Sequence, residues 1–308
     1  MRQLEKTPTL EQIPRIRKVN GGHMSYERLL IDSPEHGTQF VKLHDPTMFT
    51  DHIRERHSRE YLVKEHAMMQ HLRDRDFIHV PSHSRMIGDY GLVMEGLPTD
   101  ESWHWKAPDL ELSSYIDTVL GALEELEEAQ PPNDFLDSHM PAHIALLEEG
   151  WRNLGDTSLE HVAVKLGSIL PSLSPNFQQD AVRLIDSLPS LINRDVVAVP
   201  KKFAHHDLRQ ANLAWHPQHG VRFVDWSWAG LGLEKADRTS LLIDLHKSGH
   251  RVIDYIEEHF NTDHAHLLLG FLLARSIAPG RNEDSAVRFH QAVSAISTYS
   301  LMTQAETA

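Results

Sequence analysis

The segment from residue 203 to residue 232 constrains this chain more than any other part, because it combines polar side chains at fixed spacing with strand and turn signals. Its sequence is FAHHDLRQANLAWHPQHGVRFVDWSWAGLG. Asp207 opens a polar stretch after the β-like run 196–199, which predicts a loop that leaves a strand-like end. Asn212 follows five residues later, near enough for both side chains to face one cavity.

Asp225 lies at the end of a second strand predicted in the same segment. The run 221–226 alternates apolar and polar residues, and the turn residues His219 and Gly220 precede it. We therefore expect Asp225 to face the same cavity as Asp207 and Asn212.

Two acids and an amide at this spacing suit the transfer of a phosphoryl group from ATP. That reaction needs a carboxylate that orients and deprotonates the attacking hydroxyl, and oxygen ligands for the Mg²⁺ that bridges the phosphates. One alternative is a surface cluster of histidines. Another is a metallohydrolase in which His205, Asp207 and His216 bind a transition metal. Because the chain holds 23 histidines, clustering is a weak signal, and phosphoryl transfer is favoured because it predicts residues elsewhere.

The pattern HHDxxxxN at 205–212, followed by FVDW at 223–226, resembles the aminoglycoside phosphotransferase and choline kinase-like superfamily, whose members are relatives of protein kinases. The resemblance implies that Asp207 is the catalytic base. It also implies that Asn212 is a metal ligand and that Asp225 is the main Mg²⁺ ligand.

Two further residues, His206 and Asp237, can be compared with the family. The family usually has glycine or asparagine where this chain has His206. An aspartate at the place of Asp237 starts a helix and braces the catalytic loop in the family. As an N-cap, its carboxylate could also bind backbone N–H groups.

Phosphoryl transfer predicts a lysine on an amino-terminal strand, where its ammonium reaches the α and β phosphates. Lys42 lies in the alternating run 39–43. Upstream, a first strand ends in a loop with Gly21 and Gly22, and this loop together with Ser25 is expected to lie over the phosphates. The alternative for Lys42 is a lysine on an edge strand that keeps the sheet soluble.

A helix is expected to present a carboxylate to that lysine. In the segment 58–74 the apolar side is formed by residues at spacings of three and four: Leu62, Glu65, Met68, Met69 and Leu72. A carboxylate on a packing face requires a partner, because burying it unpaired is costly. We expect Glu65 to pair with Lys42; the alternative is a solvated glutamate at the rim of the stripe.

The resemblance also implies an adenine-binding connection between two lobes. A strand-like run over 90–94 is broken by the residues EGLP. By resemblance, Met94 borders the adenine, and the carbonyl of Glu95 and the N–H of Leu97 bind the base.

The implied structure is a protein-kinase-like fold of the α+β class, with a small antiparallel sheet and one helix in a nucleotide-binding lobe, residues 1–96. A larger, mainly helical lobe, residues 97–308, would carry catalysis and substrate binding. The implied activity is phosphorylation of a small-molecule hydroxyl with ATP and Mg²⁺. A protein kinase is disfavoured because the HRD and DFG patterns are absent. A binding-only pseudokinase remains an alternative, although the lysine and the metal ligands are retained.

Composition narrows the partners of the chain. The net charge of −14 argues against nucleic acid and anionic membranes and is compatible with a cationic acceptor such as an amino sugar or amino alcohol. No cysteine occurs, so disulfides and thiolate sites are excluded. The amino terminus lacks the apolar core of a signal peptide and no run approaches a membrane span, so we expect a cytoplasmic protein.

Helical periodicity dominates after residue 98. A stripe over 116–126 predicts a helix whose other face carries a run of glutamates, as is typical of a solvated face; a wall for a cationic substrate is the alternative. Further helices are predicted over 159–170, 177–192, 235–247, 252–260, 264–274 and 286–302.

Overall fold

The structure is a computed structural model that describes residues 15–19, 26–49, 51–132, 143–196, 198–278 and 282–305. It divides into two compact units. The first comprises the described residues of Met1–Glu111 together with Ala211–Ser227, and the second comprises those of Leu112–Gln210 and Trp228–Ala308. The predicted lobes, 1–96 and 97–308, are defined by function, one for nucleotide binding and one for catalysis. The two compact units are defined by packing alone, so the functional division stays a prediction.

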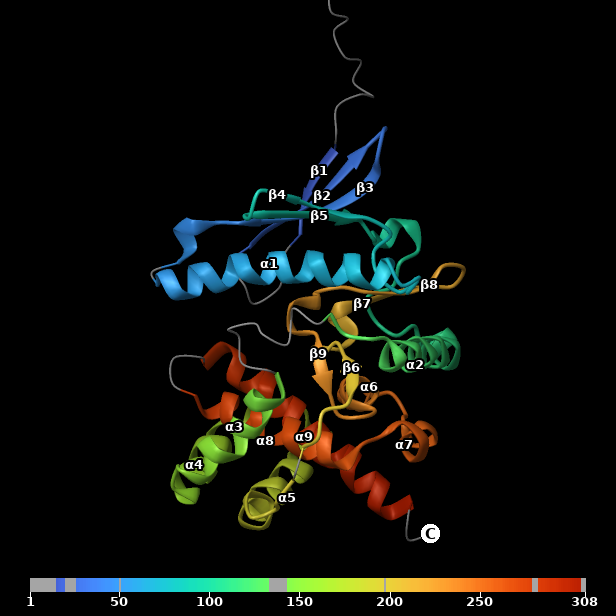
Figure 1. The fold of residues 1–308 in the computed structure, drawn as a ribbon. Helices are drawn as coiled ribbons and strands as arrows, with labels where there is room; N and C mark the ends of the chain where they lie inside the picture. Colours follow the sequence, from blue (N-terminus) through green and yellow to red (C-terminus); the bar gives the residue numbers. More distant parts are fainter. Residues whose placement is uncertain are drawn as a thin grey trace, which may run out of the picture. The chain divides into compact units, whose positions relative to one another are not determined.

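The first unit is built on a five-stranded antiparallel sheet in the order β1-β2-β3-β5-β4 (Figure 1). Its strands are β1 (Arg15–Lys18), β2 (Tyr26–Ser33), β3 (Gly37–His44), β4 (Ser84–Ile87) and β5 (Gly91–Glu95). The β2–β3 turn begins after Ser33 and ends at Gly37, whose φ of 65° is the left-handed value that glycine adopts without strain. In β3, Lys42 is flanked by Arg28 of β2 and Leu92 of β5, so it lies on an interior strand and the edge-lysine alternative is wrong.

Helix α1 (His52–Arg73) contacts β4 and β5 and runs along the sheet (Figure 1). It begins where the carboxylate of Asp51 accepts the N–H of Ile53 at 2.8 Å, as an N-cap does. The five residues of the predicted stripe, including Glu65, are all buried. The prediction of a helix with Glu65 on its packing face is therefore confirmed.

A hairpin completes the first unit. Its strands are β7 (Leu213–His216) and β8 (Gly220–Phe223), which pair in antiparallel register with Leu213 opposite Phe223. The segment after β5 adds short 3-10 turns, η3 (Thr99–Glu101) and η4 (Asp109–Glu111). An isolated bridge between His104 and Trp215 joins that segment to the hairpin.

The second unit is mainly helical (Figure 1). Its elements are α2 (Leu112–Glu128), α3 (His143–Gly155), α4 (Leu159–Ile169), α5 (Pro175–Ile192), β6 (Lys202–Ala204), β9 (Gly230–Gly232), α6 (Ala236–Lys247), α7 (Ile253–His259), α8 (Thr262–Ile277) and α9 (Asn282–Ala305). Helix α9 contacts α5, α6, α7 and α8 and buries Phe289, Ala292 and Val293 at the centre. With the antiparallel sheet and its single helix, this confirms the predicted α+β class.

The second unit differs from the sequence prediction in one strand and one helix. The strand that leads to Asp207 is β6, and the described residues of the run 196–199 lie in no strand; Pro200 lacks an N–H donor, and the pairing partner β9 ends at Gly232, opposite Lys202. Helix α3 was not predicted. Its Gly150 lowers helix propensity, yet this glycine lets the helix approach the backbone of α8 closely at Phe271.

The close contact between α3 and α8 generates a stability prediction. Replacing Gly150 by alanine would drive a Cβ into the backbone at Phe271, so we expect the free energy of unfolding to fall by about 1–3 kcal/mol. Gly121→Ala in α2 is the matched control, because no atom lies within 4 Å of the added Cβ; it should raise stability by about 0.5–1 kcal/mol. Urea unfolding of both variants decides, and a neutral Gly150→Ala would contradict the packing.

Candidate active site

A buried lysine and two carboxylates form the polar centre of the first unit. The Nζ of Lys42 lies 2.9 and 2.8 Å from the two carboxylate oxygens of Glu65 and 3.3 Å from Oδ1 of Asp225. Lys42 is 6% and Glu65 1% exposed, so water does not screen their attraction. The predicted pairing of Lys42 with Glu65 is present in the structure, and the rim alternative for Glu65 is wrong.

The charge state of Lys42 follows from these partners. Burial by itself lowers the pKa of the ammonium, but the carboxylates of Asp225 and Glu65 outweigh burial, so the pKa of Lys42 is raised above its ordinary value. The group therefore stays cationic at neutral pH. A fixed cation of this kind can bind an anionic ligand such as a phosphate.

Asp225 is held in a strained backbone conformation. Its φ of 68° lies in the left-handed region, which non-glycine residues seldom adopt. The N–H of Asp225 donates to Oε1 of Glu65 at 3.0 Å, so Glu65 binds the side chain of Lys42 and the backbone of Asp225 at once. The Asp225 side chain itself remains 40% exposed and can accept further ligands.

An aromatic cluster supports the strand end that carries Asp225. Trp226 is fully buried, donates its indole N–H to the carbonyl of Phe223 at 2.9 Å, and contacts the ring of Phe77 edge-on. Phe223 also stacks on Phe77. The packing of Phe223 and Trp226 against Phe77 therefore fixes the turn that carries Asp225.

Asn212 and Asp225 lie at the same end of the β7–β8 hairpin. Asn212 immediately precedes β7, and its carbonyl accepts the N–H of Val224 at 2.9 Å. A carboxylate and an amide oxygen from adjacent positions are the oxygen donors that Mg²⁺ prefers, and phosphate oxygens and water can supply the rest. The donor set fits the predicted metal.

The residues predicted to bind adenine lie at the end of β5 and directly after it, in the first unit. Met94 is 1% exposed, and the N–H of Gly96 donates to the carbonyl of Thr38 at 2.9 Å. The carbonyl of Leu97 accepts the indole N–H of Trp105 at 3.0 Å. The carboxylate of Glu95 accepts the N–H of Ser82. These bonds fix the segment, while its contact with a base stays a prediction.

Asp207 belongs to the second unit, where it follows β6. Its carboxylate is 31% exposed and lies 3.3 Å from Nε of Arg209. Sequence reasoning missed Arg209; its place two residues after the proposed base was the only signal. How Asp207 approaches the metal ligands of the first unit stays a prediction. The predicted residues Gly21, Gly22 and Ser25 lie outside the described residues.

Asp237 braces the loop that carries Asp207. Its two carboxylate oxygens accept the N–H groups of His205 at 2.6 Å and His206 at 2.9 Å. Asp237 is 3% exposed and lies in the first turn of α6. This arrangement agrees with bracing through backbone N–H groups.

His206 stands at a backbone position that explains why glycine or asparagine would suit it. Its φ is 67°, in the left-handed region, where histidine is tolerated better than most side chains. Its ring nitrogen Nε2 lies 2.9 Å from the carbonyl of Leu231, and the ring contacts Gly232 so closely that a Cβ there would clash. The ring therefore joins the loop after β6 to β9.

The ring contacts of His206 predict that two substitutions by glycine, both at left-handed positions, change the stability of the protein in opposite directions. His206→Gly relieves backbone strain but removes a buried ring and its hydrogen bond, so we expect stability to fall by about 1 kcal/mol or more. Asp76→Gly replaces an exposed residue with a φ of 60° and should raise stability by about 0.5–1 kcal/mol, because the left-handed strain that it removes exceeds the extra entropy that glycine loses on folding. Equal gains for both variants in thermal unfolding would show that the His206 ring contributes nothing.

A buried histidine near this loop generates a pH prediction. Burial, with a smaller effect of His206, lowers the pKa of His264 to about 3. The unfolded chain protonates His264 near pH 6.5, whereas the folded chain keeps it neutral. The contribution of this group to the free energy of unfolding is therefore fully present above pH 6.5 and is lost as the pH falls below that value. We expect a loss of about 1.4 kcal/mol per pH unit from this group between pH 6 and pH 4. Urea unfolding of His264→Gln should show a shallower pH dependence; the exposed His161→Gln serves as control.

Two absences concern only the part of the chain that the structure describes. Within those ranges, no three histidine, aspartate or glutamate side chains are grouped so that they could hold a metal ion. In the same ranges, no helix is both long and apolar enough to cross a membrane.

Solved structures with this fold include small-molecule kinases. A choline kinase from Streptococcus pneumoniae is 14% identical with a TM-score of 0.54, covering 92% of this chain and 94% of the other. An aminoglycoside phosphotransferase from Alicyclobacillus acidocaldarius is 14% identical with a TM-score of 0.51, covering 100% and 98%. A spectinomycin phosphotransferase, solved with ADP and spectinomycin, is 14% identical with a TM-score of 0.52, covering 92% and 93%.

Sequence comparison identifies the family. No curated protein matches the sequence. A profile of the phosphotransferase enzyme family matches residues 25–269, which include Lys42, Glu65, Asp207, Asn212 and Asp225. At these identities the solved structures establish the fold, and the profile establishes the membership: the chain belongs to the phosphotransferase enzyme family.

Proposed function

We propose that the protein transfers the γ-phosphoryl group of ATP, with Mg²⁺, to a hydroxyl group of a small molecule. The observation that carries the proposal is that the buried ammonium of Lys42 bonds to both Glu65 and the half-exposed Asp225. This arrangement joins a phosphate-binding cation to a metal-binding acid in one rigid cluster. A lysine that only stabilised the sheet would not need the second, half-exposed carboxylate.

Each residue has a role in the proposed reaction. Lys42, held by Glu65, binds the α and β phosphates. Asn212 and Asp225 hold Mg²⁺, which when bound neutralises charge on the phosphates. Asp207 orients the acceptor hydroxyl and removes its proton as the oxygen attacks phosphorus.

Nucleotide recognition is assigned to the remaining predicted residues. Met94, Glu95 and Leu97 form the adenine-binding connection, and Gly21, Gly22 and Ser25 cover the phosphates. The spectinomycin phosphotransferase of similar fold was solved with ADP, which supports an adenine nucleotide here.

The acceptor class is proposed from charge and from relatives. Two proteins of similar fold are a choline kinase and an aminoglycoside phosphotransferase, and choline and aminoglycosides are cationic. The net charge of −14 favours attraction of such a molecule. We therefore propose an amino sugar or amino alcohol as acceptor and the cytoplasm, where ATP is available, as the location.

Nucleotide titration with and without Mg²⁺ tests the proposal. Asp225→Asn should remove the Mg²⁺ dependence of ATP binding, because the main metal ligand loses its charge. Asp207→Asn should leave ATP affinity unchanged and lower turnover by about 10²–10⁴-fold, because it removes the base. Asp186→Asn, an exposed position in α5, is the control.

Turnover is measured as ADP release during a screen of cationic sugars, amino alcohols and sugar amines. If neither ATP nor ADP binds the wild type, the proposal fails. If nucleotide binds and no hydroxyl compound in the screen is phosphorylated, a nucleotide-binding scaffold is favoured.

A further inference from the structure

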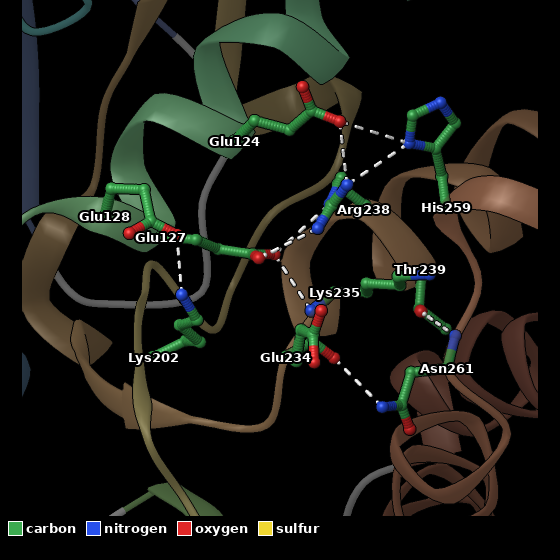
Figure 2. Close-up of polar contacts among 10 residues, drawn as sticks. All are labelled: Glu124, Glu127, Glu128, Lys202, Glu234, Lys235, Arg238, Thr239, His259 and Asn261. Carbon is green, nitrogen blue, oxygen red and sulfur yellow. Dashed lines mark hydrogen bonds and ion pairs between the residues drawn. The ribbon is translucent and has the colours of Figure 1, made fainter.

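A buried ion pair joins the last turn of α2 to the first turn of α6 within the second unit (Figure 2). The guanidinium of Arg238 donates from Nη2 to Oε2 of Glu127 at 2.8 Å and from Nε to Oε1 at 3.2 Å. The two side chains are 7% and 8% exposed. The fork-like geometry fixes both the distance and the orientation between the two helices.

The position of Glu127 corrects the expectation of a solvated glutamate face on α2. Glu124, Glu125 and Glu128 are exposed, but Glu127 is buried against Arg238. The prediction grouped all four glutamates on the polar side of α2, but helical spacing puts Glu127 on the apolar side with Leu120 and Leu123. Spacing could not show that α6 brings an arginine to it.

Glu127 also binds the backbone where α6 begins. Its Oε1 accepts the N–H of Lys235 at 2.9 Å, and Lys235 has a φ of 61°, in the left-handed region. The start of α6 has no side-chain cap of its own. Glu127 therefore fixes both the chain entering α6 and, through Arg238, its first turn.

The same arrangement occurs at the two places assigned to catalysis. The left-handed Asp225 donates its N–H to the buried Glu65, and the left-handed His206 donates to the buried Asp237. Lys235 and Glu127 repeat this geometry. The other non-glycine residues with positive φ among the described ranges, Asp76 and Ser102, donate to main-chain carbonyls of ordinary turns.

Residue 237 lies between the two residues that Glu127 holds. Asp237 accepts the N–H groups of His205 and His206 and so sets the course of the loop before Asp207. A rotation of the first turn of α6 would carry these acceptor oxygens away. The chain of contacts thus runs from α2 through Glu127, Arg238 and Asp237 to the loop.

The energetics of the pair do not favour a purely stabilising role. Burial raises the pKa of Glu127, and the opposing effects of Arg238 and the Lys235 N–H do not cancel it. Buried ion pairs commonly recover only part of their desolvation cost and are often replaceable by apolar pairs. Orientation is the property that an apolar pair would not reproduce.

We propose that Glu127 and Arg238 are positioning residues for the reaction, which hold Asp237 so that the loop presents Asp207 to the acceptor hydroxyl. The catalytic part of this inference rests on the proposed function. Neither residue is assigned a contact with substrate.

The test compares two double variants. Glu127→Leu with Arg238→Met replaces the buried pair by apolar side chains. Glu128→Leu with Lys202→Met does the same to the exposed pair one residue further along α2, whose atoms lie 2.6 Å apart (Figure 2). For each variant we measure thermal unfolding, hydrogen exchange of peptides covering 203–210, and ADP affinity. The fourth measurement is ADP release from MgATP, with either water or a compound from the screen as acceptor.

For the buried-pair variant we expect a folded protein with unchanged ADP affinity, about tenfold or faster exchange in 203–210, and turnover lowered about 10–100-fold at unchanged KM for ATP. The exposed-pair variant should match the wild type in all four measurements. The single variant Arg238→Met should resemble the buried-pair variant with lower stability, because it leaves Glu127 unpaired.

Normal exchange in 203–210 and normal turnover in a folded buried-pair variant would overturn the proposal and leave the pair a structural role alone. If the buried-pair variant does not fold, Arg238→Lys replaces it: it keeps the charge but loses the fork, and unchanged exchange and turnover would again overturn the proposal. If the wild type neither binds nor consumes ATP, the proposed function fails, while hydrogen exchange still decides whether the pair positions the loop.

Discussion

The buried ammonium of Lys42 is the constraint on which the described site depends. A cation on an interior strand must be compensated, and Glu65 of α1 and Asp225 after β8 supply the charge from two distant parts of the chain. The pairing therefore fixes helix to sheet and hairpin to both. It also leaves the Asp225 carboxylate half-exposed, so the group that stabilises the fold is available to a metal.

A second principle recurs in both units. Residues next to the proposed chemistry adopt left-handed backbone conformations, and a buried carboxylate accepts the N–H of each: Glu65 for Asp225 and Asp237 for His206. Strain at such positions persists only where neighbouring groups determine the conformation. The carboxylates of Glu65 and Asp237 are thus supports of backbone geometry. Glu127, which holds Lys235 in the same way, belongs with them.

The sequence predicted the parts of the site that depend on local pattern. The helical spacing of 62–72 placed Glu65 on the packing face, and alternation placed Lys42 in a strand; both are confirmed. Their contact was expected because a buried carboxylate needs a partner, and the structure shows it. Helix α3 escaped because Gly150 weakens the local signal and is explained only by the close approach of α8. The strand before Asp207 was misplaced because the run 196–199 resembles a strand, whereas pairing with β9 selects 202–204.

The sequence by itself indicated the family through the resemblance of its motifs, and that resemblance implied the residue types of the proposed phosphoryl-transfer site and the α+β class. Strand alternation and helical periodicity agreed with that class. The tertiary structure decided which polar residues are partners. Asp225 as a second partner of Lys42, the ring contact of His206 with β9, and the bond between Glu127 and Arg238 join segments far apart in the chain. Local pattern cannot specify such pairs, because only folding brings their atoms within hydrogen-bonding distance.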